Sequence, residues 1–346
     1  MCFLPGFLYW NNICGMDLEC LNREPFYYTL CLHVLALISF PINLFGCYLI
    51  VSKSPKNSKY KYRQLYVQIV TSIVENYMTW IGGGYYLFPM VGGFNTSSIT
   101  TLVTNPHTSV VFYFFVFAFE LPALLSCFQY RADSAAELDE KSRIPSIISY
   151  TICFLCHCYP FVIAISLYLS KLSPEEQYRF ISTNFPKCIH VLENPEFIVY
   201  DYSTNFWLGI SGISTMIWTV SYALYFLFLA IRTVRTLQAM RTHMSIATFK
   251  LHQTALLTLS LQVLIPSSLV LTPIIFIFIV VVKKLSQYQE IATDTTFLIA
   301  AHSMVSTIVI ICCSSRYLEV VRDIFCLIPW KMETKINPIV ERSAKF

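Results

Sequence analysis

The stretch from Phe26 to Arg63 constrains the fold more than any other part of this sequence. No charged residue occurs between Phe26 and Ser52, and this length suffices to cross a hydrocarbon core about 30 Å thick. Five basic residues follow at once, with no acid among them: Lys53, Lys56, Lys59, Lys61 and Arg63. Basic residues beside a span tend to stay in the cytoplasm. The pattern therefore predicts a first membrane span with the N-terminus outside.

The composition favours the membrane class for the whole chain. Charged residues make up 13% of the sequence and apolar residues 55%, and the mean hydropathy is +0.57. A soluble domain carries roughly a quarter charged residues. We therefore expect the lipid bilayer to be a partner, and we expect no nucleic acid.

Apolar runs separated by polar loops predict six further spans. They cover about 64–89, 105–130, 144–170, 205–231, 251–282 and 294–313. The chain then divides into an extracellular segment (1–25), a seven-helix transmembrane domain (26–313) and a cytoplasmic part (314–346). The predicted fold class is an all-α, seven-transmembrane bundle resembling a G-protein-coupled receptor.

The distribution of basic residues supports this topology. Of the 24 Lys and Arg residues, 18 fall in the predicted cytoplasmic segments and six in the outer ones, so none falls within a span. Asn95 begins an Asn-x-Ser/Thr sequon in a predicted outer loop, which makes it a candidate for glycosylation.

The tail begins with an amphipathic pattern. In 316–325 the charged and apolar residues separate onto opposite faces at helical period, which predicts a short helix lying at the membrane surface. Cys326 follows where palmitoylation would place a lipid, although an unmodified Cys at a helix end is an equal alternative.

Short motifs recur in order along nearly the whole chain. They are His33, Pro41 and Phe45-Gly46-x-Tyr48; Arg63, Tyr66 and Gln68; Phe88-Pro89 and Gly92-Gly93; Gln262, Pro266 and Pro273; His302-Ser303-x-x-Ser306-Thr307; and Arg316-Tyr317. Together they resemble the nematode serpentine chemoreceptors of the str superfamily, class I (Sri) above all and class H (Srh) next. Three rhodopsin-class marks are absent: an Asn-Pro-x-x-Tyr ending, an acid before Arg131, where Gln129-Tyr130 stands, and a Cys near the outer end of the third span to pair with Cys188.

The resemblance implies a chemosensory receptor in the plasma membrane, with a sensory cilium as one such location. Such a receptor binds an extracellular small molecule and signals through a heterotrimeric G protein. No cofactor, metal or catalytic residue is implied.

Ionisable residues inside spans are functional candidates because burying them is costly. Glu75 lies in the middle of the second span and His302 in the outer part of the seventh. If these spans are neighbours, both side chains should point inward and join one polar network beneath a ligand pocket. Glu120 lies nearer the inner face, which favours a structural or activation role. The alternative for each residue is a hydrogen-bonded side chain that only holds helices together.

Basic residues at the inner ends of the spans are candidates for the G-protein face. They are Arg131, Arg232, Arg235 and Arg241. The loop that carries the last three contains no acid, so it would present uncompensated positive charge to a partner.

Two other functions remain as alternatives at this point. A transporter or channel would be expected to show inverted repeats, and the halves of this sequence show no convincing correspondence. A membrane metal hydrolase could gather His33, Glu75, His157 and His302, but no His-x-x-x-His spacing supports it. Whether Cys188 forms an extracellular disulfide stays open.

Overall fold

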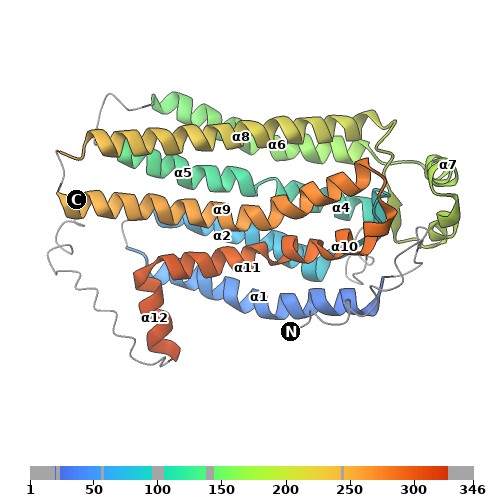
Figure 1. Cartoon of the computed structure of the whole chain (residues 1–346), viewed down its shortest axis with the longest axis horizontal. Helices are drawn as coiled ribbons and strands as arrows, with labels where there is room; N and C mark the ends of the chain where they lie inside the picture. Colours follow the sequence, from blue (N-terminus) through green and yellow to red (C-terminus); the bar gives the residue numbers. More distant parts are fainter. Residues whose placement is uncertain are drawn as a thin grey trace.

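The computed structural model describes residues 20, 24–55, 58–95, 105–137, 144–242 and 245–325. Long helices run side by side along one axis (Figure 1). They are α1 (Phe26–Lys53), α2 (Tyr60–Asn76) with the π-helical turn η2 (Tyr77–Ile81), α4 (Pro106–Phe117), α5 (Glu120–Ala136), α6 (Ser146–Leu169), α8 (Phe206–Ala239), α9 (Ile246–Val282) and α11 (Thr296–Cys313).

Six helical segments of the described chain are long and apolar enough to cross a membrane: 26–53, 106–136, 146–169, 206–239, 256–282 and 286–313. The seventh member of the bundle is α2 with η2. It is more polar, since it carries Lys61, Arg63 and Glu75. It nevertheless lies in the bundle, packed against α1, α5 and α11, so neighbouring helices shield its polar face from lipid.

Two predicted spans differ from the observed helices. The second, expected to continue to Pro89, stops being helical at Ile81, because the chain from Gly84 pairs as a strand. The third, expected as one helix over 105–130, is broken between α4 and α5. Pro122 lies in the first turn of α5, where its missing N–H costs no helical hydrogen bond.

A small antiparallel sheet and short helices close the end of the bundle that the sequence predicts to be extracellular. The sheet has the order β1-β2-β3, with β1 Gly84–Tyr86, β2 Gly92–Asn95 and β3 Phe197–Val199. A Cβ at Gly93 would collide with the Tyr85 carbonyl oxygen, so glycine is required for the strands to pair. Short helices complete this end: α7 (Pro174–Asn184), η4 (Pro186–Glu193), η5 (Ser286–Tyr288) and α10 (Gln289–Asp294).

A disulfide ties this cap together. Cys20 bonds to Cys188 in η4, with their Cα atoms 5.3 Å apart, which answers the question that the sequence left open. Tyr28 of α1 is fully buried beneath the cap, where its hydroxyl donates to the Gly84 carbonyl (2.9 Å) and contacts Thr296 Oγ1 (2.9 Å). The sheet, α1 and α11 are thus joined at one residue.

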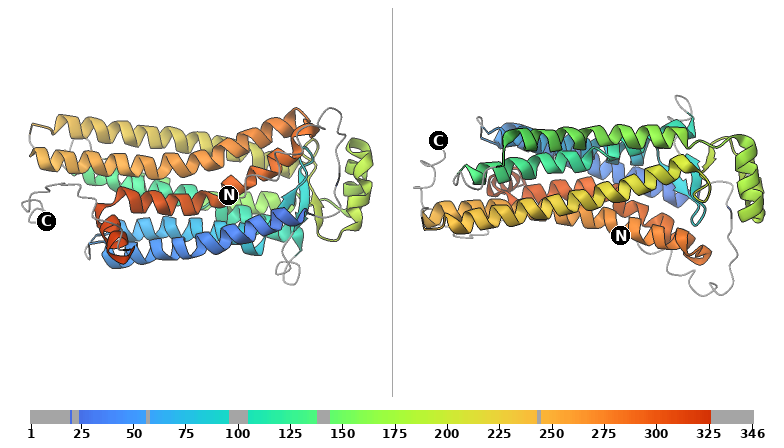
Figure 2. Two further views of the ribbon diagram at one scale, coloured as in Figure 1. Left: turned by 60° about the horizontal axis from the view of Figure 1, so that its bottom comes forward. Right: turned by 90° about the horizontal axis from the view of Figure 1, so that it is seen from above.

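At the opposite end, α12 (Ser315–Phe325) turns across the bundle axis (Figures 1 and 2). It coincides with the segment 316–325, for which the sequence predicts an amphipathic helix. Buried Tyr317 anchors it, with its hydroxyl 2.7 Å from Ser54 Oγ at the end of α1.

Candidate functional site: a buried polar network

Polar side chains gather inside the bundle between α1, α2, α5 and α11. The buried members are Ser39, Asn43, Gln68, Thr71, Glu75, Glu120, His302, Ser303 and Thr307. Helical spacing explains the grouping. Positions three, four or seven apart share one face, as Gln68 and Glu75 do on α2 and Ser303 and Thr307 on α11. These faces point inward and form a polar layer in an otherwise apolar core.

His302 and Glu120 form a buried hydrogen-bonded pair. His302 Nε2 lies 2.8 Å from Glu120 Oε1, and Nδ1 lies 2.5 Å from the Ile299 carbonyl oxygen. A carbonyl can only accept, so Nδ1 carries a hydrogen. Nε2 then either donates to the Glu120 carboxylate or accepts from the neutral carboxyl group. In both cases the pair is neutral overall and links α11 to α5.

Glu75 belongs to a second group that joins α1, α2 and α11. Its side chain is completely buried, and Oε2 accepts a hydrogen bond from Asn43 Nδ2 (2.8 Å). Asn43 Oδ1 in turn accepts from Gln68 Nε2 (3.2 Å) and from the Thr307 hydroxyl (2.6 Å). The other carboxyl oxygen, Glu75 Oε1, has no hydrogen-bond partner. Such a group is an exception among buried polar atoms, so one half of this carboxyl is unsatisfied.

The structure places the two residues that the sequence pairs in neighbouring groups of the network. Glu75 and His302 both lie inside the bundle, but among the described residues each has a different hydrogen-bond partner, Asn43 for Glu75 and Glu120 for His302. The two groups meet beside His302, where the Ser303 hydroxyl donates to Thr71 Oγ1 (3.1 Å). Sequence reasoning missed Asn43, although an amide in the middle of an apolar span was a visible signal.

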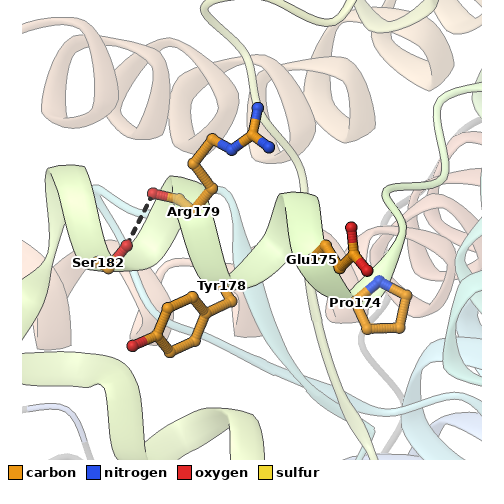
Figure 3. Close-up of a pocket in the computed structure, with 5 residues that line it drawn as sticks. All are labelled: Pro174, Glu175, Tyr178, Arg179 and Ser182. Atoms are coloured by element: carbon orange, nitrogen blue, oxygen red, sulfur yellow. Dashed lines mark hydrogen bonds between the residues drawn. The ribbon is translucent and has the colours of Figure 1, made fainter.

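Two hollows mark the surface and the interior. One, of about 560 Å³, lies on the extracellular helix α7 (Figure 3). Its lining comes from that helix and its first turn: Pro174, Glu175, Tyr178, Arg179 and Ser182. Residues of a single exposed helix offer a ligand little enclosure. The other hollow, between α2, α5, α9 and α11, has a volume of 10 Å³, which is about one water molecule.

The family model of the serpentine type 7TM GPCR chemoreceptor Sri matches residues 18–321. The chain belongs to this family. No similar sequence was found among curated proteins. The family and the seven-transmembrane fold predicted from the sequence are thereby confirmed, and the Sri receptor is a multi-pass protein of the plasma membrane.

The four basic candidates of this Sri receptor lie in different environments. Arg235 and Arg241 are exposed at the cytoplasmic end of α8 and just beyond it, and Arg232 is half-buried. Arg131 is not on an open face. Its guanidinium lies 3.9 Å above the centre of the Tyr60 ring. Only Arg235 and Arg241 are therefore exposed, and Arg241 also contacts the Phe249 ring (5.7 Å).

Other predicted residues are placed as follows. His33 is exposed on α1, and His157 stacks on Tyr66 at 5.9 Å. No group of three metal-binding side chains occurs within the described part of the chain. Asn95 ends β2 and is half-buried, whereas the rest of its sequon and Cys326 lie outside the described residues.

Proposed function

We propose that this Sri chemoreceptor binds an extracellular small molecule and signals through a heterotrimeric G protein, with the buried polar network as its activation switch. The observation that carries the proposal is the network itself. It joins four helices in the core and leaves Glu75 Oε1 without a partner. Any rearrangement that brings a donor to Glu75 Oε1 adds a hydrogen bond. The added bond would stabilise a second arrangement of the network.

The position of the network supports a role in transmission rather than in first contact with ligand. Above it the extracellular cap and an aromatic cluster with Tyr28, Tyr85 and Phe94 are densely packed. Below it the helices continue to the basic cytoplasmic ends. A ligand that shifts α11 relative to α2 would strain the Asn43–Thr307 and Ser303–Thr71 bonds first.

A ligand screen tests the signalling proposal directly. Cells that express the receptor are loaded with a calcium indicator and exposed to a library of small volatile and water-soluble compounds. At least one compound should raise calcium in these cells and not in cells that express the chain with Arg235 and Arg241 both neutralised. Surface expression, measured in parallel, must be equal for the two chains.

The switch is tested separately with Glu75→Gln and His302→Ala. Glu75→Gln keeps the shape of the side chain, so it should change basal activity or ligand potency more than it changes folding. Glu175→Gln on the exposed face of α7 is the matched control. Residues in one network couple, so the double variant should depart from the sum of the single effects. Strict additivity of the signalling effects would mean that the two sites act independently.

A further inference from the structure

We propose that two crossed arginine–tyrosine pairs form a latch between α2 and α5 that holds the cytoplasmic end of the receptor in its inactive arrangement. The latch residues are Tyr60 and Arg63 of α2 and Tyr130 and Arg131 of α5. The inhibitory role rests on the proposed G-protein coupling, whereas the latch itself can be tested without it.

Each pair joins the two helices, because its cation lies on one helix and its ring on the other. Arg131 of α5 lies 3.9 Å above the Tyr60 ring of α2, and Arg63 of α2 lies 5.3 Å from the Tyr130 ring of α5. The two rings are themselves 5.9 Å apart at 32°. Each helix therefore supplies one cation and one aromatic face. Both cation-to-ring distances lie within the range of a cation–π attraction.

The two arginines are not equally satisfied. Arg63 Nη1 also donates to the Ser126 carbonyl oxygen on α5 (3.0 Å), so this half of the latch is fixed by a charge-assisted hydrogen bond. Arg131 Nε is buried and has no hydrogen-bond partner. A guanidinium covered by a ring, with one N–H unmet, is better solvated in water or against an acidic partner. The Arg131–Tyr60 half is therefore the one that opens.

The surrounding elements show which side moves. Near Arg131, α5 is fastened to its other neighbours through Gln129, which donates to Ser149 Oγ of α6 (3.0 Å) and accepts from the Tyr225 hydroxyl of α8 (2.6 Å). The first turn of α2, by contrast, carries two basic residues and no acid. Lys59 at its N-cap makes no side-chain capping bond, and Lys61 in that turn is unfavourable beside the positive end of the helix dipole. The latch stabilises this turn by holding it against α5.

The test uses the full chain with Tyr60→Leu, which removes the aromatic face but keeps an apolar side chain. Basal nucleotide exchange on the G protein should rise several-fold in membranes that hold this variant. Tyr60→Phe keeps the ring and should stay within twofold of the unmodified receptor. Tyr62→Leu is the matched control, because Tyr62 faces outward two residues further on and pairs with Lys61 at 5.0 Å in an exposed contact. It should change nothing.

A second measurement needs no G protein. In the purified receptor in lipid nanodiscs, amide hydrogen exchange over the first turn of α2 should speed up in Tyr60→Leu and in Arg131→Gln to the same extent. Combining the two changes should add nothing further. Unchanged exchange in either variant overturns the latch. Faster exchange without a rise in basal activity overturns its inhibitory role. An unmodified receptor that activates no G protein with any compound overturns the proposed function, while the exchange data still judge the latch.

Discussion

Buried polar residues in the core differ in how many of their polar atoms have a hydrogen-bond partner. Glu120 and His302 are hydrogen-bonded to each other, whereas only one of the two carboxyl oxygens of Glu75 has a hydrogen-bond partner. The sequence shows both acidic residues, but it does not show which of them has a hydrogen-bond partner at each oxygen. The two sites should therefore respond differently to substitution: Glu75→Gln should affect signalling more than stability, whereas loss of His302 should affect both.

Removing His302 should destabilise the receptor strongly. His302→Ala leaves the buried Glu120 carboxyl without its partner, and breaking a buried pair on one side costs about 3–5 kcal/mol. Adding Glu120→Gln to the same chain should restore part of the loss, because an amide strands no charge. Chemical unfolding in detergent measures both variants. A double variant as unstable as the single one would mean that the pair contributes packing alone.

Removing Asn43 should have a smaller effect of the same sign. Asn43→Ala removes the hydrogen bond to Glu75 Oε2, and a buried polar group left unsatisfied costs about 1–3 kcal/mol. Ser52→Ala is the control near the end of the same helix. Its exposed hydroxyl donates to the Tyr48 carbonyl oxygen (2.6 Å), so thermal unfolding should barely change. Equal losses for both would show that Asn43 has no special role.

The sequence predicted which residues would be buried but not which would touch. Charge inside a span is costly, and this alone places Glu75 and His302 in the interior. Their partners depend on how far each helix is rotated and shifted along its axis, which a hydrophobic pattern does not specify. The second helix begins at Tyr60 rather than at residue 64, and a Glu120–His302 contact required a relation between α5 and α11 that no motif encodes.

Whole elements were predicted best where they are long and apolar. Spans such as Phe26–Lys53 follow from length and composition. The strands of the cap did not, because three or four residues are too few to show alternation. Gly92 and Gly93 were recognised only as a motif, and their reason, close strand pairing, appears in the structure alone.

The extracellular helix α7 should loosen in acid. Glu176 Oε2 accepts from the Ser173 backbone N–H (2.7 Å) and from its hydroxyl (2.8 Å), forming a capping box. These hydrogen bonds, backbone first, lower the pKa of Glu176 below its ordinary value. The stabilisation is therefore complete above that ordinary pKa and is lost as the pH falls through the lowered one.

Hydrogen exchange of the α7 amides, corrected for the intrinsic pH dependence, measures this loosening. Glu176→Gln supplies the control, since glutamine can also cap but does not titrate in this range. Protection in that variant should not vary over the same acid range. A variant that loosens in acid as the unmodified helix does would assign the effect to another group.

At the scale of the whole molecule, the division of basic residues predicts the orientation. Epitope tags at the two ends of the chain test it in intact and permeabilised cells. The N-terminal tag should be stained without permeabilisation and the C-terminal tag only after it. An N-terminal tag hidden in intact cells would invert the topology. Asn95→Gln should in addition increase gel mobility if the sequon is used.

The disulfide between Cys20 and Cys188 spans 168 residues of the chain, and this distance sets an order of events during synthesis. Cys188 reaches the lumen only after α1, α2, α4 with α5, and α6 have been made. At about 5–20 residues per second, Cys20 waits there for roughly 10–30 s as a free thiol. The disulfide of the extracellular cap therefore forms late in synthesis. A chain that stalls midway presents an unpaired cysteine to the oxidoreductases of the secretory pathway.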